Sequence, residues 1–187
     1  MSDVAPLGAT TSPGDTGLEV FVGKSIEAIC TSTGFGAIGD AQNHCAHFVG
    51  HALRFTSGIG FKCSQMDKRS GFTQSKDFKQ MGVLIRVHEF YNNNNLTNKT
   101  ELDITDFSKA PTSGLIFVTK TSNFSKDLAT MGNIPRKHIG IIKDGFVYHY
   151  GNTDDAVRKD TVAKFVTRMT SAYGGSVKFT TTALPKG

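Results

Sequence analysis

The sequence has no long apolar run and no cluster of basic residues. No apolar stretch approaches the ~18 residues that a membrane-spanning helix requires, so we expect no membrane span. Lysine and arginine are scattered, and no basic run is longer than a pair such as Lys68-Arg69, which argues against nucleic-acid binding. The formal net charge of +5 instead suits an anionic partner or surface.

Cysteine is also scarce, and the N-terminal residues lack the features of an export signal. Cys30, Cys45 and Cys63 are an odd set that cannot form a complete disulfide framework. If Cys45 is a free nucleophile, Cys30 and Cys63 either pair in an oxidising compartment or stay as buried thiols, and both alternatives remain open. The first residues have neither a basic region nor an apolar core, so we expect no Sec signal peptide and synthesis in the cytosol.

The arrangement of apolar residues predicts one α+β domain. A chain of 187 residues has the size of a single domain, and residues 1–17 are rich in Gly, Pro, Ser and Thr, which predicts a flexible N-terminal segment. Apolar residues at helical spacing predict helices over 18–31, 40–55 and 160–173. Branched and aromatic residues predict strands over 81–90, 115–119, 138–152 and 177–184, with a loop over 121–137. Helices followed by mostly antiparallel strands are typical of an α+β fold.

Cys45 begins the apolar stripe of the predicted helix over 40–55. At about 100° per residue, Phe48 and Leu53 fall on the side of Cys45, so the thiol is expected to face the sheet that this helix covers. Free backbone N–H groups at a helix start favour the thiolate, which is the nucleophilic form of cysteine. The alternative for a lone cysteine at this position is a small buried core residue.

Two histidines on the same helix raise the question of a metal site. His47 and His51 have the i, i+4 spacing of zinc-protease helices, but the glutamate that follows the first histidine in those enzymes is missing. Both also fall on the side away from Cys45, where they are expected to be surface or partly packed residues. The sequence therefore predicts no metal and no cofactor.

The segment that starts at His138 is the second half of the candidate site. Two β-rich runs flank Asp144-Gly145, which is a typical hairpin turn pair. A two-residue turn would place His149 on the same face as His138, whereas a turn with a glycine bulge would place Asn152 there instead. The small Gly140 is expected to leave space on that face for a helix or a substrate.

These motifs resemble the papain-like superfamily that contains the NlpC-type peptidases and the CHAP amidases. The match consists of Cys45-Ala-His-Phe-Val at a helix start, the strand His138-Ile-Gly-Ile and the second strand Gly145-Phe-Val-Tyr-His149. In NlpC-type members a histidine-glycine strand is followed by a strand that ends in histidine. The resemblance therefore implies Cys45 as nucleophile, His138 as base and His149 as third catalytic residue, with Asn152 as the alternative.

The chain also departs from the family pattern. His44 and Ala46 stand where the family usually has aspartate and serine, and the separation of Cys45 from His138 is longer than is typical. The resemblance then implies a single cysteine hydrolase domain over 18–187, in which the cysteine helix packs on the sheet, with an insertion at about 64–113.

The resemblance implies cleavage of amide bonds in bacterial peptidoglycan, by a stem-peptide endopeptidase or an amidase. The thiolate would attack the carbonyl, and backbone N–H groups near Cys45 would hold the oxyanion with help from Gln42 or His44. Without a Sec signal, delivery to the periplasm or cell wall of a target bacterium would need another route, as for antibacterial effectors injected by contact-dependent secretion or for phage lysis enzymes. An effector of that kind can have a cognate immunity protein as a partner. The bond that is cut and the delivery route are left open.

Two alternatives to this function also remain open. One is an enzyme of the same fold that acts on proteins as a peptidase, deamidase or acyltransferase. The other is a non-enzymatic binding module in which Cys45 is part of the core.

Overall fold

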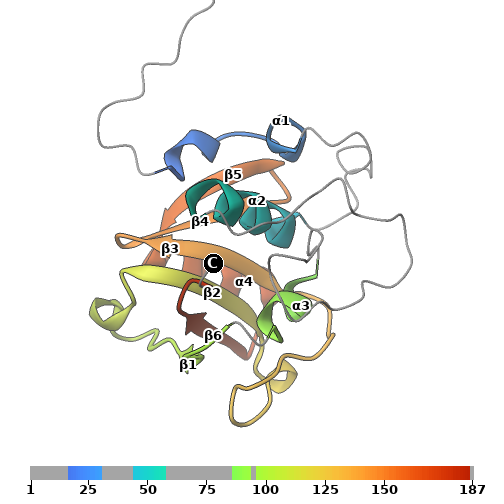
Figure 1. The fold of residues 1–187 in the computed structure, drawn as a ribbon. Helices are drawn as coiled ribbons and strands as arrows, with labels where there is room; N and C mark the ends of the chain where they lie inside the picture. Colours follow the sequence, from blue (N-terminus) through green and yellow to red (C-terminus); the bar gives the residue numbers. More distant parts are fainter. Residues whose placement is uncertain (1–16, 31–43, 58–85, 94–95, 186–187) are drawn as a thin grey trace, which may run out of the picture.

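The structure is a computed structural model that describes residues 17–30, 44–57, 86–93 and 96–185 (Figure 1). The helices are α1 (Ile26–Ile29), α2 (Cys45–Ser57), α3 (Val87–Tyr91) and α4 (Val162–Tyr173), with 3-10 turns η1 (Glu19–Phe21), η3 (Phe107–Lys109) and η4 (Thr121–Asn123). The strands are β1 (Thr100–Glu101), β2 (Ser113–Lys120), β3 (His138–Lys143), β4 (Phe146–Gly151), β5 (Ala156–Thr161) and β6 (Val177–Thr182). Gln42 and Cys63 lie outside the described residues.

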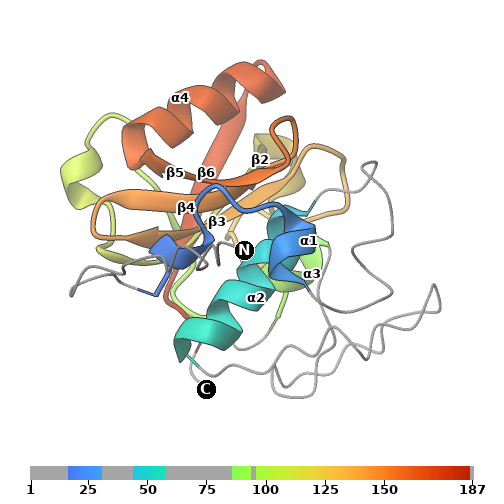
Figure 2. The same cartoon turned by 90° about the horizontal axis from the view of Figure 1, so that it is seen from above.

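The six strands form one antiparallel sheet in the order β1-β6-β2-β3-β4-β5, which confirms the α+β class. Helices α2 and α4 cover opposite faces of this sheet (Figures 1 and 2). The middle strands are consequently buried on both faces, and six of the eight residues of β2 are buried. None of the described helices is both long and apolar enough to cross a lipid bilayer.

Successive residues of β3 belong to two separate apolar clusters. Ile139 and Ile141 pack with α2, whereas Ile142 packs with α4 on the other face. This alternation follows from the two-residue period of a strand. The stripe predicted on the Cys45 helix is confirmed, because Phe48 and Leu53 are both fully buried in the cluster on the α2 face.

The hairpin between β3 and β4 has a two-residue turn. Asp144 and Gly145 have φ values of 50° and 82°, and the strands pair Lys143 with Phe146 and Ile141 with Tyr148. Positive φ at both central residues is the geometry that Asp-Gly favours in hairpin turns. This register decides between the two alternatives, because it places residues 138 and 149 on the same face.

Two of the predicted elements are wrong in part. The strand expected over 81–90 is helical from Val87 to Tyr91, because Val87, Phe90 and Tyr91 bury apolar side chains at helical spacing. Residues 81–85 lie outside the described residues. The helix expected over 18–31 is reduced to η1 and α1. Gly23, with a φ of 78°, separates the two, and the Ser25 hydroxyl caps α1.

The C-terminal elements follow the prediction with one addition. Helix α4 begins at Val162, after the Thr161 hydroxyl accepts a hydrogen bond from the Lys164 amide, and Gly174 with a φ of 61° follows its end. Strands β2 and β6 and the loop over 121–137, which contains η4, lie where they were expected. Strand β5 was not predicted, and it includes Asp160, which was assigned to the helix.

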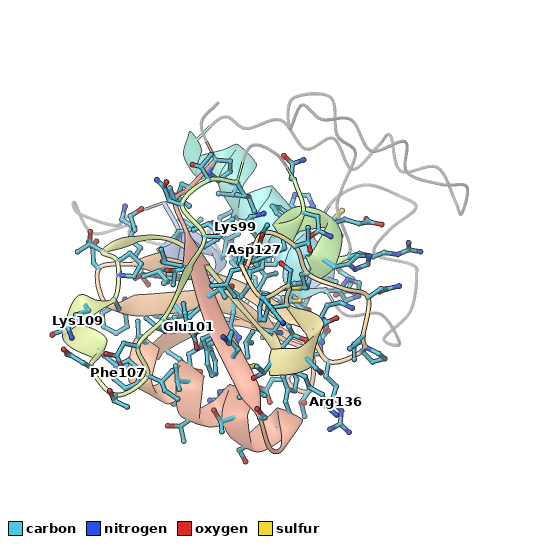
Figure 3. All side chains as sticks on the ribbon, turned by 90° about the horizontal axis from the view of Figure 1, so that it is seen from below. Lys99, Glu101, Phe107, Lys109, Asp127 and Arg136 are labelled. Carbon is cyan, nitrogen blue, oxygen red and sulfur yellow. The ribbon has the colours of Figure 1, made fainter. Side chains whose placement is uncertain are left out.

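Short or covered strands form the edges of the sheet. At one edge β1 has only two residues, of which Glu101 pairs with Lys178 of β6 at 2.7 Å. Figure 3 shows this side of the molecule, with Glu101 labelled. At the other edge the backbone of Gly23 and Lys24 bonds to Val157 of β5. Such coverage limits edge-to-edge association of sheets.

Candidate active site

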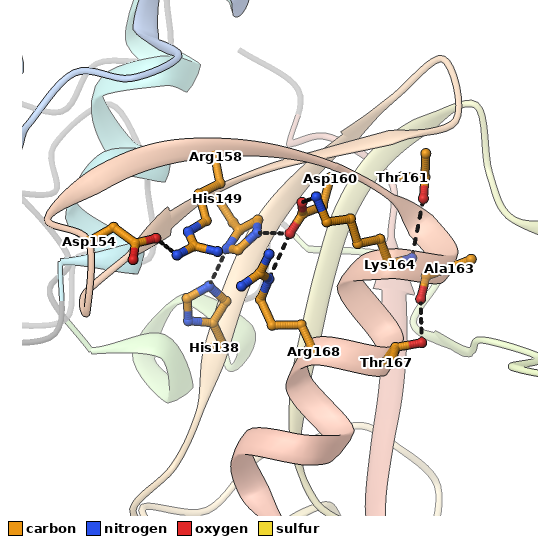
Figure 4. A network of polar contacts seen from close by, with 10 residues as sticks. All are labelled: His138, His149, Asp154, Arg158, Asp160, Thr161, Ala163, Lys164, Thr167 and Arg168. Atoms are coloured by element: carbon orange, nitrogen blue, oxygen red, sulfur yellow. Dashed lines mark hydrogen bonds and ion pairs between the residues drawn. The ribbon is translucent and has the colours of Figure 1, made fainter.

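His138 and His149 meet on the face of the sheet that α4 covers (Figure 4). The Nε2 atom of His138 lies 3.0 Å from Nδ1 of His149, and both side chains are buried. Their rings also contact the ring of Phe165 from α4, at centroid distances of 5.9 and 4.9 Å. The pair therefore has the juxtaposition that was predicted for a two-residue turn.

Asp160 extends this pair into a chain of three residues. Its Oδ2 atom lies 3.2 Å from Nε2 of His149 and accepts a hydrogen bond of 2.8 Å from Nε of Arg168. Its other oxygen lies 3.1 Å from Nζ of Lys164. Asp160 was not predicted as a site residue, because its strand β5 was not predicted. The sequence did hold one signal for Asp160. Lys164 and Arg168 follow it by four and eight residues, a spacing that lets cationic side chains on a helix reach a preceding carboxylate.

The ionised Asp160 fixes the direction of the hydrogen bonds. Burial by itself raises the pKa of Asp160, but hydrogen bonds from Arg168, Lys164 and His149 outweigh it and hold the pKa at about 2. A carboxylate only accepts hydrogen bonds, so His149 must donate from Nε2 and accept at Nδ1. His138 then donates from Nε2, and its Nδ1 atom is left without a proton.

Both imidazoles are neutral near pH 7. Burial lowers the pKa of His138 well below its ordinary value, and a charge on His149 would lower it further. Burial lowers the pKa of His149 to about 4, although Asp160 favours the charged ring. A neutral ring with a bare Nδ1 can accept a proton, and the low pKa makes His138 a weak base in this state.

Gly140 allows the two strands to bring these histidines together. A Cβ atom at Gly140 would lie 2.6 Å from Cγ1 of Val147, 3.1 Å from the Tyr148 carbonyl oxygen and 3.2 Å from Cβ of His149. The space expected beside Gly140 for a helix or substrate is thus filled by β4. The β3–β4 ladder ends at the pair Ile141–Tyr148, so the first residues of β3 lie beyond it.

Cys45 lies fully buried at the start of α2, as part of the cluster on the opposite face of the sheet. Burial raises the pKa of its thiol to about 12, against the lowering effect of the Ile139 and Ala46 amides and of Lys137. The expectation that the helix start favours the thiolate is therefore corrected, because desolvation has the larger effect. The hydrogen bond from the Ile139 amide places the sulfur beside the residue that follows His138.

The Ile139 amide bonds to the Cys45 sulfur, and Nε2 of His138 bonds to His149, so these two contacts point to different partners. Asn152, the alternative third residue, has a different role. Its exposed side chain accepts a hydrogen bond of 3.2 Å from the His44 amide, just before α2. The His44 ring, an oxyanion candidate, packs against Tyr150 at a centroid distance of 5.8 Å. The other candidate, Gln42, lies outside the described residues.

We expect acid to destabilise the fold through His149. The unfolded chain protonates this residue as the pH falls through its ordinary pKa of 6.5, but the folded chain does so only near 4. The free energy of unfolding should therefore fall across this window, by about 3 kcal/mol at 1.36 kcal/mol per pKa unit. Urea unfolding at pH 7.5 and 4.5 measures it. His149→Gln should show a smaller loss, and an equal loss in that variant would contradict the assignment.

No protein-family model matches the chain, and neither a curated protein nor a solved structure matches it. The resemblance to the NlpC-type superfamily consequently rests on Cys45, His138, Gly140 and His149 as they stand in this sequence.

Proposed function

We propose that this chain is a cysteine hydrolase that cleaves amide bonds. The observation that carries the proposal is the buried hydrogen-bond chain from Asp160 through His149 to His138, which leaves Nδ1 of His138 as a base. A nucleophile, a base and an orienting group are the three parts of this chemistry. Cys45 supplies the nucleophile at the same end of β3.

In the proposed reaction the Cys45 thiol transfers its proton to Nδ1 of His138 as the sulfur attacks the carbonyl carbon. The tetrahedral intermediate collapses when the C–N bond breaks and the amine leaves with that proton. Water then attacks the thioester, gives one proton to His138 and releases the acid, and the proton returns to the sulfur. Asp160 and His149 stabilise the positive charge on His138 at each stage.

The thiol and the base approach the start of β3 from opposite faces of the sheet. The sulfur lies next to the Ile139 amide, and the β3–β4 ladder has already ended at Ile141. Attack therefore requires the Cys45 side chain to leave the Ile139 amide and meet His138 at the start of β3. Catalytic hydrogen bonds are often long or absent before substrate binds.

For the substrate we propose bacterial peptidoglycan, cut within its stem peptide or between peptide and glycan. The support is the family resemblance together with a net charge of +5, which suits an anionic cell wall. The same resemblance supports a role as an antibacterial effector or lysis enzyme that acts in the periplasm or cell wall of a target bacterium. A cognate immunity protein would be the partner of such an effector.

Incubation of purified sacculi with the wild-type protein and with Cys45→Ala tests the proposal. We expect new muropeptide fragments with the wild-type protein alone, because the alanine variant lacks the nucleophile. Their masses identify the bond that is cut. If the sacculi stay intact while a protein substrate is cleaved in a Cys45-dependent manner, the substrate is a polypeptide and the hydrolase proposal stands. Fragments from both proteins would overturn the role of Cys45.

The full burial of Cys45 favours a second candidate, a non-enzymatic domain in which this residue is part of the core. Alkylation with iodoacetamide at neutral pH separates the two candidates. Modification of Cys45 in the folded protein, detected by peptide mass spectrometry, is expected for the hydrolase. A thiol that reacts only after urea is added, together with intact substrates, would favour the binding module.

A further inference from the structure

A second cluster of reactive side chains lies outside the candidate active site. Cys30 follows the last residue of α1, and His47 and His51 lie one turn apart on α2. Their ligand atoms, one sulfur and two ring nitrogens, all lie within 4.8 Å of one another. The two Nε2 atoms are only 3.0 Å apart. Three potential metal ligands, one just after α1 and two on α2, therefore lie close enough together to bind a single ion.

The burial of this cluster differs from the expectation for these histidines. His47 is fully buried and Cys30 is buried, while His51 is half-buried. The prediction that both histidines are surface or partly packed residues is thus wrong for His47. A buried imidazole needs a polar partner, and here another imidazole and a thiol lie close to it.

The second ring nitrogen of His47 has an orienting contact of its own. Its Nδ1 atom lies 3.5 Å from Nδ1 of His44, so His47 can donate there and direct the lone pair of Nε2 toward His51. Imidazoles that bind metals commonly donate their other N–H group to a neighbouring acceptor. The contact with His44 is compatible with the tautomer that a metal ligand requires.

We propose that Cys30, His47 and His51 bind a zinc-like divalent transition metal ion. One thiolate and two imidazoles form a soft donor set that suits zinc and excludes calcium or magnesium, which take oxygen ligands. With Zn–N distances of about 2.0–2.1 Å and a tetrahedral angle, two ligand nitrogens lie about 3.3 Å apart. The observed separation of 3.0 Å is close to this value.

Such an ion would fasten α1 to the helix that carries Cys45. The segment around α1 is already anchored at its start, where the Ile26 amide donates to the Tyr150 hydroxyl at 2.9 Å. A bond from Cys30 would anchor its other end directly on α2. Because His47 and His51 fall on the side of α2 away from Cys45, the site is structural in this proposal and does not depend on the hydrolase activity.

Metal content and Co²⁺ spectra of the full chain test this site. We expect the purified protein to retain about one equivalent of zinc after dialysis and to show a thiolate-to-Co²⁺ charge-transfer band after substitution with cobalt. In Cys30→Ser the charge-transfer band should disappear. The metal affinity should fall at least tenfold in each of the two single variants, Cys30→Ser and His51→Gln. Cys45→Ser is the matched control, which should keep both the band and the affinity.

Three outcomes would overturn the proposal: absence of bound metal in the wild-type protein, a cobalt spectrum without a thiolate band, or unchanged affinity in both ligand variants. The wild-type spectrum decides the question even if a ligand variant fails to fold. Zinc should also raise the melting temperature of the wild-type and Cys45→Ser proteins by several degrees and that of His51→Gln by clearly less. Muropeptide release is a separate readout, so failure of the metal site and failure of the hydrolase proposal are distinguishable.

Discussion

Replacement of Asp160 with asparagine is expected to slow the proposed amide hydrolysis by on the order of 10³-fold while the chain stays folded. The asparagine amide would donate to Nε2 of His149, which then carries its proton on Nδ1 and donates to Nε2 of His138. The proton of His138 moves to Nδ1, and the nitrogen that accepts a proton in the proposed reaction is lost. The rate of muropeptide release, measured under identical conditions for the variant and the wild-type protein, gives the effect.

Asp144→Asn is the matched control, because it makes the same chemical change at an exposed turn residue. Its φ of 50° is one that asparagine tolerates, so both the fold and the rate should be unchanged. Nitrogen-15 shifts of the imidazole rings report the tautomers without any substrate. A proton that stays on Nε2 of His138 in Asp160→Asn would contradict a control of the His138 tautomer by Asp160, whatever the enzymatic result.

Phe165→Ala is expected to destabilise the fold by about 3–5 kcal/mol. Phe165 is fully buried in the cluster between α4 and the sheet, and its ring contacts both His138 and His149. It also lies against Phe179 of β6, at a centroid distance of 6.3 Å. Truncation removes these contacts and leaves a cavity beside two neutral imidazoles. Urea unfolding at neutral pH measures the loss.

Phe107→Ala provides the comparison, since Phe107 packs on the same apolar cluster but is only partly buried. Its loss of stability should be clearly smaller, because less apolar surface is withdrawn from water there. Equal losses in the two variants would contradict the view that α4 is fixed through Phe165. In Phe165→Ala we also expect the His149 ring to lose its fixed orientation, visible as broadened imidazole resonances.

The local sequence was sufficient where a segment has one strong pattern and no competing partner. The Asp144-Gly145 pair predicted the hairpin, the stripe after Cys45 predicted the buried face of α2, and β6 was found from its branched residues. It was insufficient where tertiary contacts override propensity. Residues 87–91 contain strand-forming types, yet they form a helix because this conformation buries Val87, Phe90 and Tyr91 together.

For the candidate site, the sequence by itself determined the residues that could do chemistry, because Cys45, His138 and His149 occur in recognisable local motifs. Tertiary structure decided how they are connected. The register of one turn placed His149 beside His138, and the pairing of β5 with β4 brought in Asp160, whose strand has no clear local pattern. Burial, a property of the whole fold, decided that the Cys45 thiol is protonated despite its place at a helix start.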